Sequence, residues 1–175
     1  ETSSISLSER SVLSNTLSTN NASCYGSCDG TASIVVSGGS PGYSYQWNDL
    51  AFQTTPIASN LCAGSYSVTV TDTNGCVDIT SVVISEPPPI ILTTSSVNSN
   101  CGNNDGQISV VANGGNPGYT FIWDDPSSAT SPTVGNLIAG TYTVSVTDAS
   151  GCSAFASATI NDNGSGNASV VVNDN

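Results

Sequence analysis

The sequence predicts an all-β protein made of two tandem antiparallel β-sandwich domains braced by disulfides. The stretch NLCAGSYSVTVTDTNGC, residues 60–76, returns as NLIAGTYTVSVTDASGC, residues 136–152. About half of the positions in 29–76 are identical in 105–152, so each copy is one structural unit. Short alternations of apolar and polar residues, separated by Gly, Pro and Asn turns and without a helical period, are typical of antiparallel sandwiches.

The composition excludes several classes of function. The chain has thirteen acidic residues, one basic residue (Arg10) and no histidine, giving a net charge of −12. Nucleic acids and anionic membranes are therefore poor partners, because both require Lys or Arg to neutralise phosphate. No apolar run approaches the roughly 20 residues of a membrane span, so membrane insertion is not expected. Without His or Lys, only carboxylate chemistry is left for an enzyme, and we predict none.

Four segments follow one another along the chain. The first is rich in Ser and Thr and is either a flexible linker or a docking strand, because Ile5 and Leu7 alternate with polar residues. Near the other end, Val170, Val171 and Val172 belong to a short strand pattern, which either begins a third repeat or supplies an edge strand to another copy. The chain begins without Met or a leader pattern, so we expect a mature or excised piece. The expected boundaries are 1–22 (N-terminal segment), 23–86 (repeat 1), 87–160 (repeat 2) and 161–175 (C-terminal tail).

Within repeat 1, alternation predicts four strands, at TASIVVS (31–37), YSYQW (43–47), SYSVTVTD (65–72) and VDITSVVIS (77–85). The joint EPPP, residues 86–89, should be short and semi-rigid because successive prolines favour an extended conformation. Repeat 2 should open with the strand in IILTTSSVNSNC, residues 90–101.

The cysteines predict the disulfide framework. Two cysteines of repeat 1 have no counterpart in repeat 2, where Asn104 replaces Cys28 and Ile138 replaces Cys62. Because they vanish together, we expect them to bond to each other. The comparison then selects the pairs Cys24–Cys76, Cys28–Cys62 and Cys101–Cys152. A zinc site made by the four cysteines of repeat 1 is the alternative, but the spacings are not C-x-x-C.

The shared pattern C…DG…GG-P-GY…W…NL-AG-Y-V-V-TD--GC resembles the SprB repeat of large gliding-motility adhesins and other secreted bacterial surface proteins. The resemblance covers roughly residues 23–160, in two copies. It implies an immunoglobulin-like sandwich, export by a type IX secretion system, a cell-surface or filament role, and no enzyme activity or cofactor. The chain has only two repeats and no recognisable C-terminal sorting domain, which leaves open a fragment or a small filament subunit.

Four aromatic residues are expected to form core structure. Trp47 and Trp123 occupy positions at which a sandwich buries an indole, and Tyr66 and Tyr142 resemble its tyrosine corner. An exposed platform for sugars is the alternative.

The aspartates are expected to serve turns. Asp72 and Asp148 open DTNG and DASG, where an Asp side chain caps its own turn. Calcium could use them together with Asp49, Asp124 or Asp125, but neither copy has a dense acidic loop. Asp124 and Asp125 could in principle be an acid and a base, yet neighbours on an extended segment point opposite ways.

Three Asn-X-Ser sequons are candidate glycosylation sites, at Asn21, Asn163 and Asn167. Chance occurrence is the alternative.

The sequence thus predicts a non-enzymatic, extracellular structural protein: a homopolymeric cell-surface filament of copies joined head to tail, with a terminal strand added to a sheet edge of the next copy. The competing hypothesis is a binding or stalk module of a surface adhesin. Such a module would recognise glycans or calcium-dependent partners through the least similar loops, 48–55 and 124–131.

Overall fold

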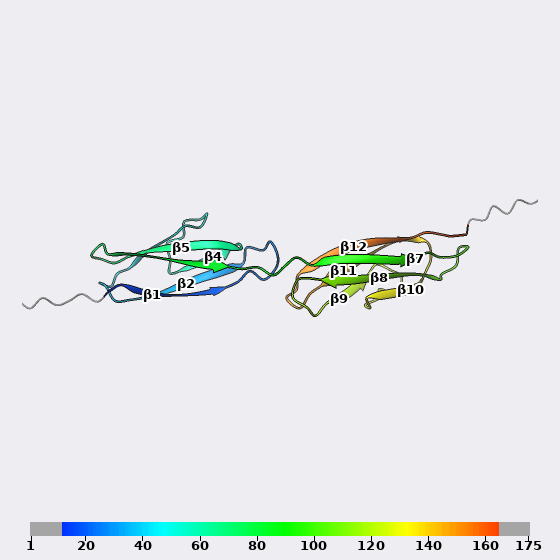
Figure 1. Cartoon of the computed structure of the whole chain (residues 1–175), viewed down its shortest axis with the longest axis horizontal. Coiled ribbons are helices and arrows are strands. Elements are labelled where there is room, and N and C mark those ends of the chain that lie inside the picture. Colours follow the sequence, from blue (N-terminus) through cyan, green and yellow to red (C-terminus); the bar gives the residue numbers. More distant parts are fainter. Residues whose placement is uncertain (1–11, 165–175) are drawn as a thin grey trace, which may run out of the picture. The chain divides into compact units, whose positions relative to one another are not determined.

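The structure is a computed structural model, and it describes residues 12–164. In this range the chain forms twelve β-strands and no helix (Figure 1). The whole chain divides into two compact units, Glu1–Pro87 and Pro88–Asn175, of which residues 12–87 and 88–164 are described. Each unit is described by itself below. Within residues 12–164, no helix is long and apolar enough to cross a membrane.

Unit 1 is a sandwich of two three-stranded antiparallel sheets. The first sheet has the order β1 (Ser14–Asn20), β2 (Gly30–Ser37), β4 (Ile57–Leu61). The second has the order β3 (Ser44–Trp47), β5 (Gly64–Thr71), β6 (Val77–Ile84). This is the strand order of an immunoglobulin sandwich that lacks one edge strand of the first sheet.

Unit 2 repeats the arrangement strand for strand. Its first sheet has the order β7 (Ile91–Val97), β8 (Gly106–Asn113), β10 (Thr133–Leu137). Its second has the order β9 (Thr120–Trp123), β11 (Gly140–Thr147), β12 (Ser153–Ile160). The predicted all-β fold of two tandem immunoglobulin-like sandwiches is confirmed.

Two strands of unit 1 were not predicted. Strand β1 lies in the segment 1–22, which we expected to stand outside repeat 1, yet it pairs with β2 over its whole length. The sequence signal is weak because Leu17 is the one apolar residue of β1. Strand β4 was hidden in the variable central segment. The predicted strand residues Ile5, Leu7 and Val170–Val172 fall outside the described residues.

Each sandwich closes over one tryptophan, as predicted. Trp47 and Trp123 are fully buried, and their indole N–H groups donate to the carbonyls of Thr55 (2.9 Å) and Ser131 (3.0 Å). Inward side chains of both sheets pack around each indole. A buried indole that keeps a hydrogen-bond partner adds apolar contact without leaving a polar group unsatisfied.

The tyrosine corner is also confirmed in both units. The Tyr66 hydroxyl donates to the Cys62 carbonyl at 3.0 Å, and the Tyr142 hydroxyl donates to the Ile138 carbonyl at 3.2 Å. Each bond ties the start of the central strand of the second sheet to the turn that leads into it.

The asparagine shared by the two NL motifs supports a bulge. Asn60 has φ 56° and Asn136 has φ 57°, and the pairing of β4 with β2 and of β10 with β8 shifts register there. Asparagine accepts this left-handed conformation better than most residues. The bulge therefore explains the repeated Asn without a functional role.

Candidate functional site

The aspartates at the β5–β6 and β11–β12 turns accept hydrogen bonds from backbone N–H groups of their own turn, such as those of Cys76 and Cys152, and of the loop beside it. Asp72 accepts N–H bonds from Ser40 (2.9 Å) and Cys76 (2.9 Å), and Asp148 accepts one from Asn116 (2.8 Å). The Ser40 N–H is the main cause that lowers the pKa of Asp72, and the Asn116 N–H plays this part for Asp148. The predicted turn-capping role is confirmed.

A second pair of aspartates holds the variable loops. The Asp49 carboxylate accepts the backbone N–H of Gln53 (2.9 Å) and of Ala51 (3.2 Å), and Asp125 accepts that of Ala129 (2.7 Å). Burial is the largest influence on both groups and acts to raise their pKa values. The hydrogen bonds together outweigh it, so the pKa values of Asp49 and Asp125 lie below the ordinary one.

The neighbours Asp124 and Asp125 serve different parts of unit 2. Asp124 is exposed and accepts the Thr143 N–H at 2.7 Å, whereas Asp125 is buried under its own loop. Two carboxylates committed to different backbone groups do not act on one bond together. In the described part of the chain, no group of three or more Cys, Asp or Glu side chains is arranged to hold a metal ion.

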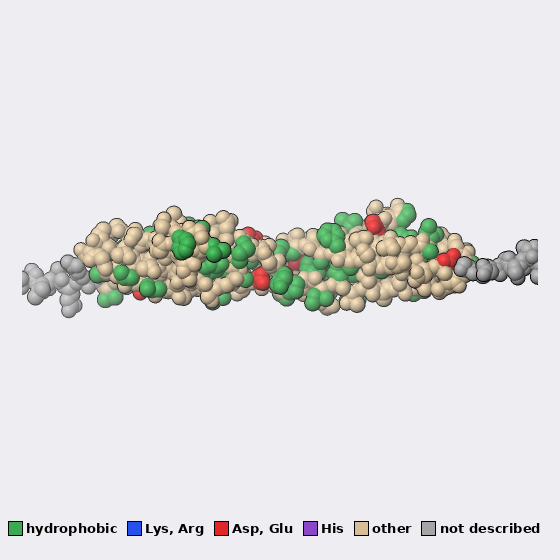
Figure 2. Space-filling view, turned by 90° about the horizontal axis from the view of Figure 1, so that it is seen from above, with side chains coloured by type: hydrophobic (Ala, Val, Ile, Leu, Met, Phe, Trp, Pro, Cys, Tyr) green, Lys and Arg blue, Asp and Glu red, His purple; other side chains and the backbone are tan. Residues whose placement is uncertain are grey.

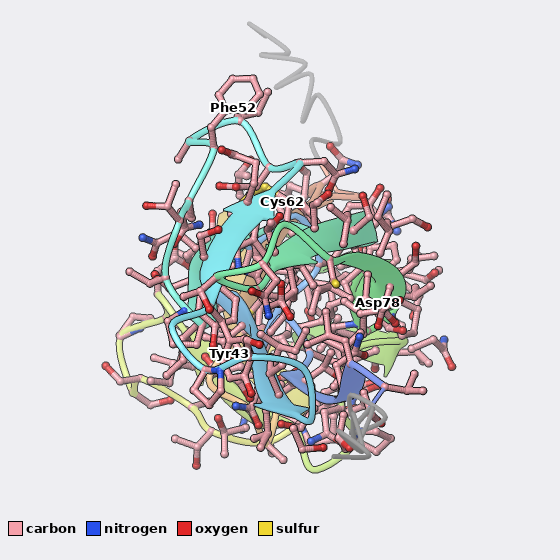
Figure 3. All side chains as sticks on the ribbon, turned by 90° about the vertical axis from the view of Figure 1, so that its left-hand side faces the viewer. Tyr43, Phe52, Cys62 and Asp78 are labelled. Atoms are coloured by element: carbon pink, nitrogen blue, oxygen red, sulfur yellow. A yellow bond between two sulfur atoms is a disulfide. The ribbon has the colours of Figure 1, made fainter. Side chains whose placement is uncertain are left out.

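The variable loop of unit 1 presents two apolar side chains to solvent. Leu50 and Phe52 are exposed, and Figure 3 shows Phe52 at the tip of the loop, pointing away from the sandwich. Beside it lies a shallow depression of about 380 Å³, lined in part by Leu50, Gln53 and Tyr66. Because the Asp49 carboxylate is hydrogen-bonded to the backbone of the loop at Ala51 and Gln53, the loop that carries these apolar side chains is held in one conformation. In unit 2, Pro126 and Ser128 take the places of Leu50 and Phe52.

Sequence reasoning missed the role of Gln53 in the same loop. Its side-chain amide accepts the Ser59 N–H at 3.0 Å and donates to the Ser59 carbonyl at 3.0 Å. Gln53 thus satisfies the outer edge of strand β4 in the way that a neighbouring strand would. Repeat 2 has Ala129 in place of Gln53, and this difference between the repeats was the available signal.

Repeat 1 contains the predicted Cys28–Cys62 disulfide. It links the β1–β2 loop to the short turn between β4 and β5 that contains Cys62, which is labelled in Figure 3. In unit 2 the corresponding residue Ile138 is exposed, so no buried contact replaces the bridge there.

The other two predicted pairs, Cys24–Cys76 and Cys101–Cys152, are wrong. Cys76 and Cys101 are exposed free thiols, whereas Cys24 and Cys152 are disulfide-bonded. Within each unit the predicted partners lie at opposite ends. The β1–β2 loop lies at the end where β6 finishes, since Ala22 N–H donates to the Ser85 carbonyl at 2.9 Å, but Cys76 is in the turn before β6.

The length of the strands makes those pairs impossible. A strand of eight residues such as β5 spans roughly 25 Å, whereas bonded cysteines have Cα atoms within about 7 Å of each other. The same geometry separates Cys101, in the β7–β8 loop, from Cys152, in the β11–β12 turn.

Two of the three sequon asparagines are described. Asn21 and Asn163 are exposed, and their side-chain oxygens accept hydrogen bonds from Ser85 N–H and from the Asn98 amide. Asn167 lies outside the described residues.

Comparison with known families gives one result that covers both units. The family model described as "SprB repeat" matches residues 16–52 and 93–128, one region in each unit. Both regions run from the first strand of a unit through its buried tryptophan to the variable loop. No curated protein matches the sequence.

Solved structures with similar folds share little sequence with this chain. An amphioxus IgVJ-C2 molecule is 13% identical with a TM-score of 0.34, over 88% of this chain and 98% of that one. The N-terminal eight Ig domains of a Down syndrome cell adhesion molecule isoform are 14% identical with a TM-score of 0.42, over 87% of this chain and 25% of that one. The BSP domain of a biofilm associated protein is 13% identical with a TM-score of 0.28, over 84% and 29%.

Proposed function

Because the chain carries two SprB repeats, each folded as an immunoglobulin-like sandwich, we propose that it is a non-enzymatic structural unit of an extracellular filament. SprB repeats occur in secreted surface proteins, and a disulfide within repeat 1 fits an oxidising exterior. In the filament, copies join head to tail, and a terminal segment of one copy adds as a strand to a sheet edge of the next.

The repeated motif itself supports a structural role. Its Trp, Tyr, Asp and Asn residues are engaged in the core, the tyrosine corner, the turn caps and the bulge of their own unit. Residues that already serve the core, the hydrogen bonds or the bulge of their own unit in this way support a scaffold rather than a reaction site. Figure 2 shows no basic side chain on the face that it presents, and the single base, Arg10, lies outside the described residues.

The observation that carries strand addition is the sheet edge at β10. The first sheet of each unit ends at β4 or β10, where a larger immunoglobulin sheet has one more strand. In unit 1 the Gln53 amide satisfies both backbone groups of Ser59 on that edge. In unit 2 the corresponding residue, Ala129, has no amide with which to do this. We therefore assign the acceptor edge to β10, since exposed edges are where strands add.

The donor is tested by trimming the ends of the full chain. Deleting residues 1–11 leaves β1 intact, whereas a deletion to residue 20 would remove a strand of unit 1. Under the proposal, fibres seen by electron microscopy are lost on deletion of either 1–11 or 165–175, whichever holds the donor strand. If both truncated chains still form fibres, strand addition is wrong, and the filament is held together in another way.

The acceptor edge is tested by placing at position 129 of repeat 2 the glutamine that hydrogen-bonds the β4 edge in repeat 1. Ala129→Gln should satisfy the β10 edge as Gln53 satisfies β4, and so reduce fibre assembly. Ala129→Leu is the matched control, because it adds a side chain of similar size without an amide. Equal assembly of the two variants would exclude β10 as the acceptor. Trp123 fluorescence checks that unit 2 remains folded, since this indole is buried in its core.

The second candidate function is recognition by an adhesin module, and the exposed pair Leu50 and Phe52 favours it. Apolar side chains on a tied loop beside a depression suit a sugar ring or a partner surface. The double variant Leu50→Ser/Phe52→Ser should then lose binding to glycans or other surface partners while it still assembles. Calcium dependence of that binding is checked by adding a chelator.

Export by a type IX secretion system and glycosylation of Asn21, Asn163 or Asn167 complete the proposal. The intact mass of secreted material tests the glycans, since the unmodified chain has a mass of 17.6 kDa.

A further inference from the structure

Two thiols are left over from the disulfide framework, and each has a bonded counterpart in the other repeat. Cys76 and Cys101 are exposed and free. Cys152, which corresponds to Cys76, and Cys24, which corresponds to Cys101, are both disulfide-bonded. Each kind of position therefore has one bonded example: Cys24 in the first loop of unit 1 and Cys152 in the last turn of unit 2. The unbonded pair consists of one cysteine of each kind.

The two thiols lie at the ends of their units that the proline joint does not occupy. Cys76 is in the β5–β6 turn, beside the β2–β3 loop, where Thr73 N–H donates to the Ser40 carbonyl at 3.3 Å. The joint at Pro87 instead follows β6, at the opposite end of unit 1.

In unit 2 the arrangement is reversed. Cys101 is in the β7–β8 loop, at the end where β12 finishes, since Ser99 N–H donates to the Asn161 carbonyl at 3.0 Å. The joint enters this unit at the other end, where Gly115 N–H donates to the Pro88 carbonyl at 2.9 Å. One unbonded thiol therefore marks each end that a neighbouring copy would meet.

We propose that Cys101 of one chain forms a disulfide with Cys76 of the next copy. This inference rests on the head-to-tail filament and adds a covalent joint to it. The partner is a second copy of this chain because a heterologous joint needs two different surfaces. The chain offers two different free thiols, Cys76 in unit 1 and Cys101 in unit 2, each at the end of its unit away from the proline joint. Repeated along the filament, the bond makes a continuous covalent polymer.

The surroundings of Cys76 suit a docking end. The thiol lines a shallow pocket of about 380 Å³ together with the apolar residues Val12, Leu13 and Val77 and the acidic residues Asp72 and Asp78. Asp78 is labelled in Figure 3, which views the molecule from the left-hand side of Figure 1. The apolar part of the pocket gives an incoming loop a surface to cover, and the exposed sulfur remains within its reach.

A covalent joint also counters charge repulsion between copies. Each chain carries a net charge of −12, so two chains repel each other, most strongly at low ionic strength. A disulfide holds the copies together at any salt concentration once it has formed.

The bond requires an oxidant, which is a disulfide of low molecular weight or of an exported thiol–disulfide oxidoreductase. The thiolate of one cysteine attacks that disulfide and forms a mixed disulfide, and one thiolate leaves. The thiolate of the other cysteine then attacks the mixed disulfide and displaces the second thiolate. The two cysteines lose two protons and two electrons, and the oxidant gains both as a pair of thiols.

The test mixes two complementary variants of the full chain under oxidised glutathione. Wild-type chain should give a ladder of covalent multimers in a non-reducing gel, with rungs spaced by the mass of one chain. Cys76→Ser alone and Cys101→Ser alone should each stay monomeric. Their equimolar mixture should give dimers and nothing longer, because only one joint can form between the two variants.

The linked peptides identify the bond. The chain has one basic residue, so trypsin is of little use, and pepsin at low pH is preferable because it also suppresses thiol exchange. A peptide pair joining Cys76 to Cys101 across two chains is expected. Covalent dimers of either variant alone, or a wild-type monomer with both thiols blocked or joined within one chain, would overturn the proposal.

Electron microscopy of the same samples separates this inference from the filament proposal. Fibres without any covalent ladder would support the filament proposal and contradict the disulfide between copies. Covalent multimers that never form ordered fibres would support the disulfide and contradict the filament. The double variant Cys76→Ser/Cys101→Ser should form fibres that dissociate on dilution, whereas wild-type fibres should persist.

Discussion

Removing the Cys28–Cys62 bridge should destabilise unit 1 and leave unit 2 unchanged. The bond closes a loop with a sequence separation of 34 residues. The chain-entropy relation gives about 4 kcal/mol for a loop of this length at 25 °C. Such a loss is a large part of the 5–15 kcal/mol that is typical of a small domain. The double variant Cys28→Ala/Cys62→Ala avoids leaving one unpaired thiol behind.

The two tryptophans allow each unit to be followed separately. The chain has two Trp residues, and each is buried in the core of its own unit. In a Trp123→Phe background, fluorescence during urea unfolding reports on unit 1 through Trp47. In a Trp47→Phe background it reports on unit 2. The bridge variant is compared with its parent in both backgrounds.

The expected result is a loss of about 4 kcal/mol in the free energy of unfolding of unit 1. For unit 2, neither the urea midpoint nor the slope of the free energy of unfolding against urea concentration should change. Unit 2 is the internal control because Asn104 and Ile138 stand where unit 1 has its bridge. A loss below about 1 kcal/mol in unit 1, or an equal loss in both units, would refute the view that this bond restrains the unfolded chain of unit 1.

Three further predictions concern the motif residues. Asn60→Val should cost roughly 1–2 kcal/mol because the residue has a positive φ of 56°, whereas Asn60→Gly should cost little; equal losses in urea titrations would contradict the bulge argument. Tyr66→Phe removes one hydrogen bond to a carbonyl and should cost about 0.5–1.5 kcal/mol, with an unchanged fold by circular dichroism; no measurable loss would mean that the corner is held by packing alone. The pKa values of Asp72 and Asp148 are lowered in the folded state, so their stabilisation is complete above the ordinary value of 3.8 and is lost as the pH falls through the folded values. The free energy of unfolding should therefore be level above about pH 5 and fall below about pH 4, and Asp72→Asn should weaken that fall in unit 1; an unchanged profile would show that other carboxylates control it.

Most of the fold could be predicted because, in a sandwich, apolar residues that face the core alternate along each strand with residues that face outward. Around Ile34, Trp47 and Val70, the strands alternate buried positions with more accessible ones, and their turns carry Gly, Pro or Asn. Strand β1 could not be predicted because Ser, Thr and Asn dominate it, and its pairing depends on contacts with β2 that no local pattern reveals. Strand β4 is interrupted by the bulge at Asn60, which breaks the alternation.

The disulfides show what a comparison of repeats can and cannot decide. Cys28 and Cys62 disappear together from repeat 2, and this covariation found a bond that the structure contains. The other four cysteines occur in both repeats, one in the first loop and one in the last turn of each unit. The comparison therefore cannot tell whether a loop cysteine bonds to the turn cysteine of its own repeat or of another one. Only the placement of the β1–β2 loop and the β5–β6 turn at opposite ends excludes pairing within one unit.

The candidate site was predictable in part. The variable loops were recognised by their low similarity, but the exposure of Phe52 and the cap made by Gln53 are properties of side-chain placement. The contrast between Gln53 and Ala129 was visible in the sequence. Its meaning depends on the edge position of β4 and β10, which requires the sheet order.

Negative-stain electron microscopy of native, non-reduced material, with the intact mass of the same sample after reduction, tests the central claim most directly. A head-to-tail filament predicts continuous fibres with one short axial repeat, and a mass near 17.6 kDa plus any glycan. Isolated particles, or a much larger polypeptide with these two repeats inside it, would contradict the claim and identify the chain as a stalk segment of a surface adhesin.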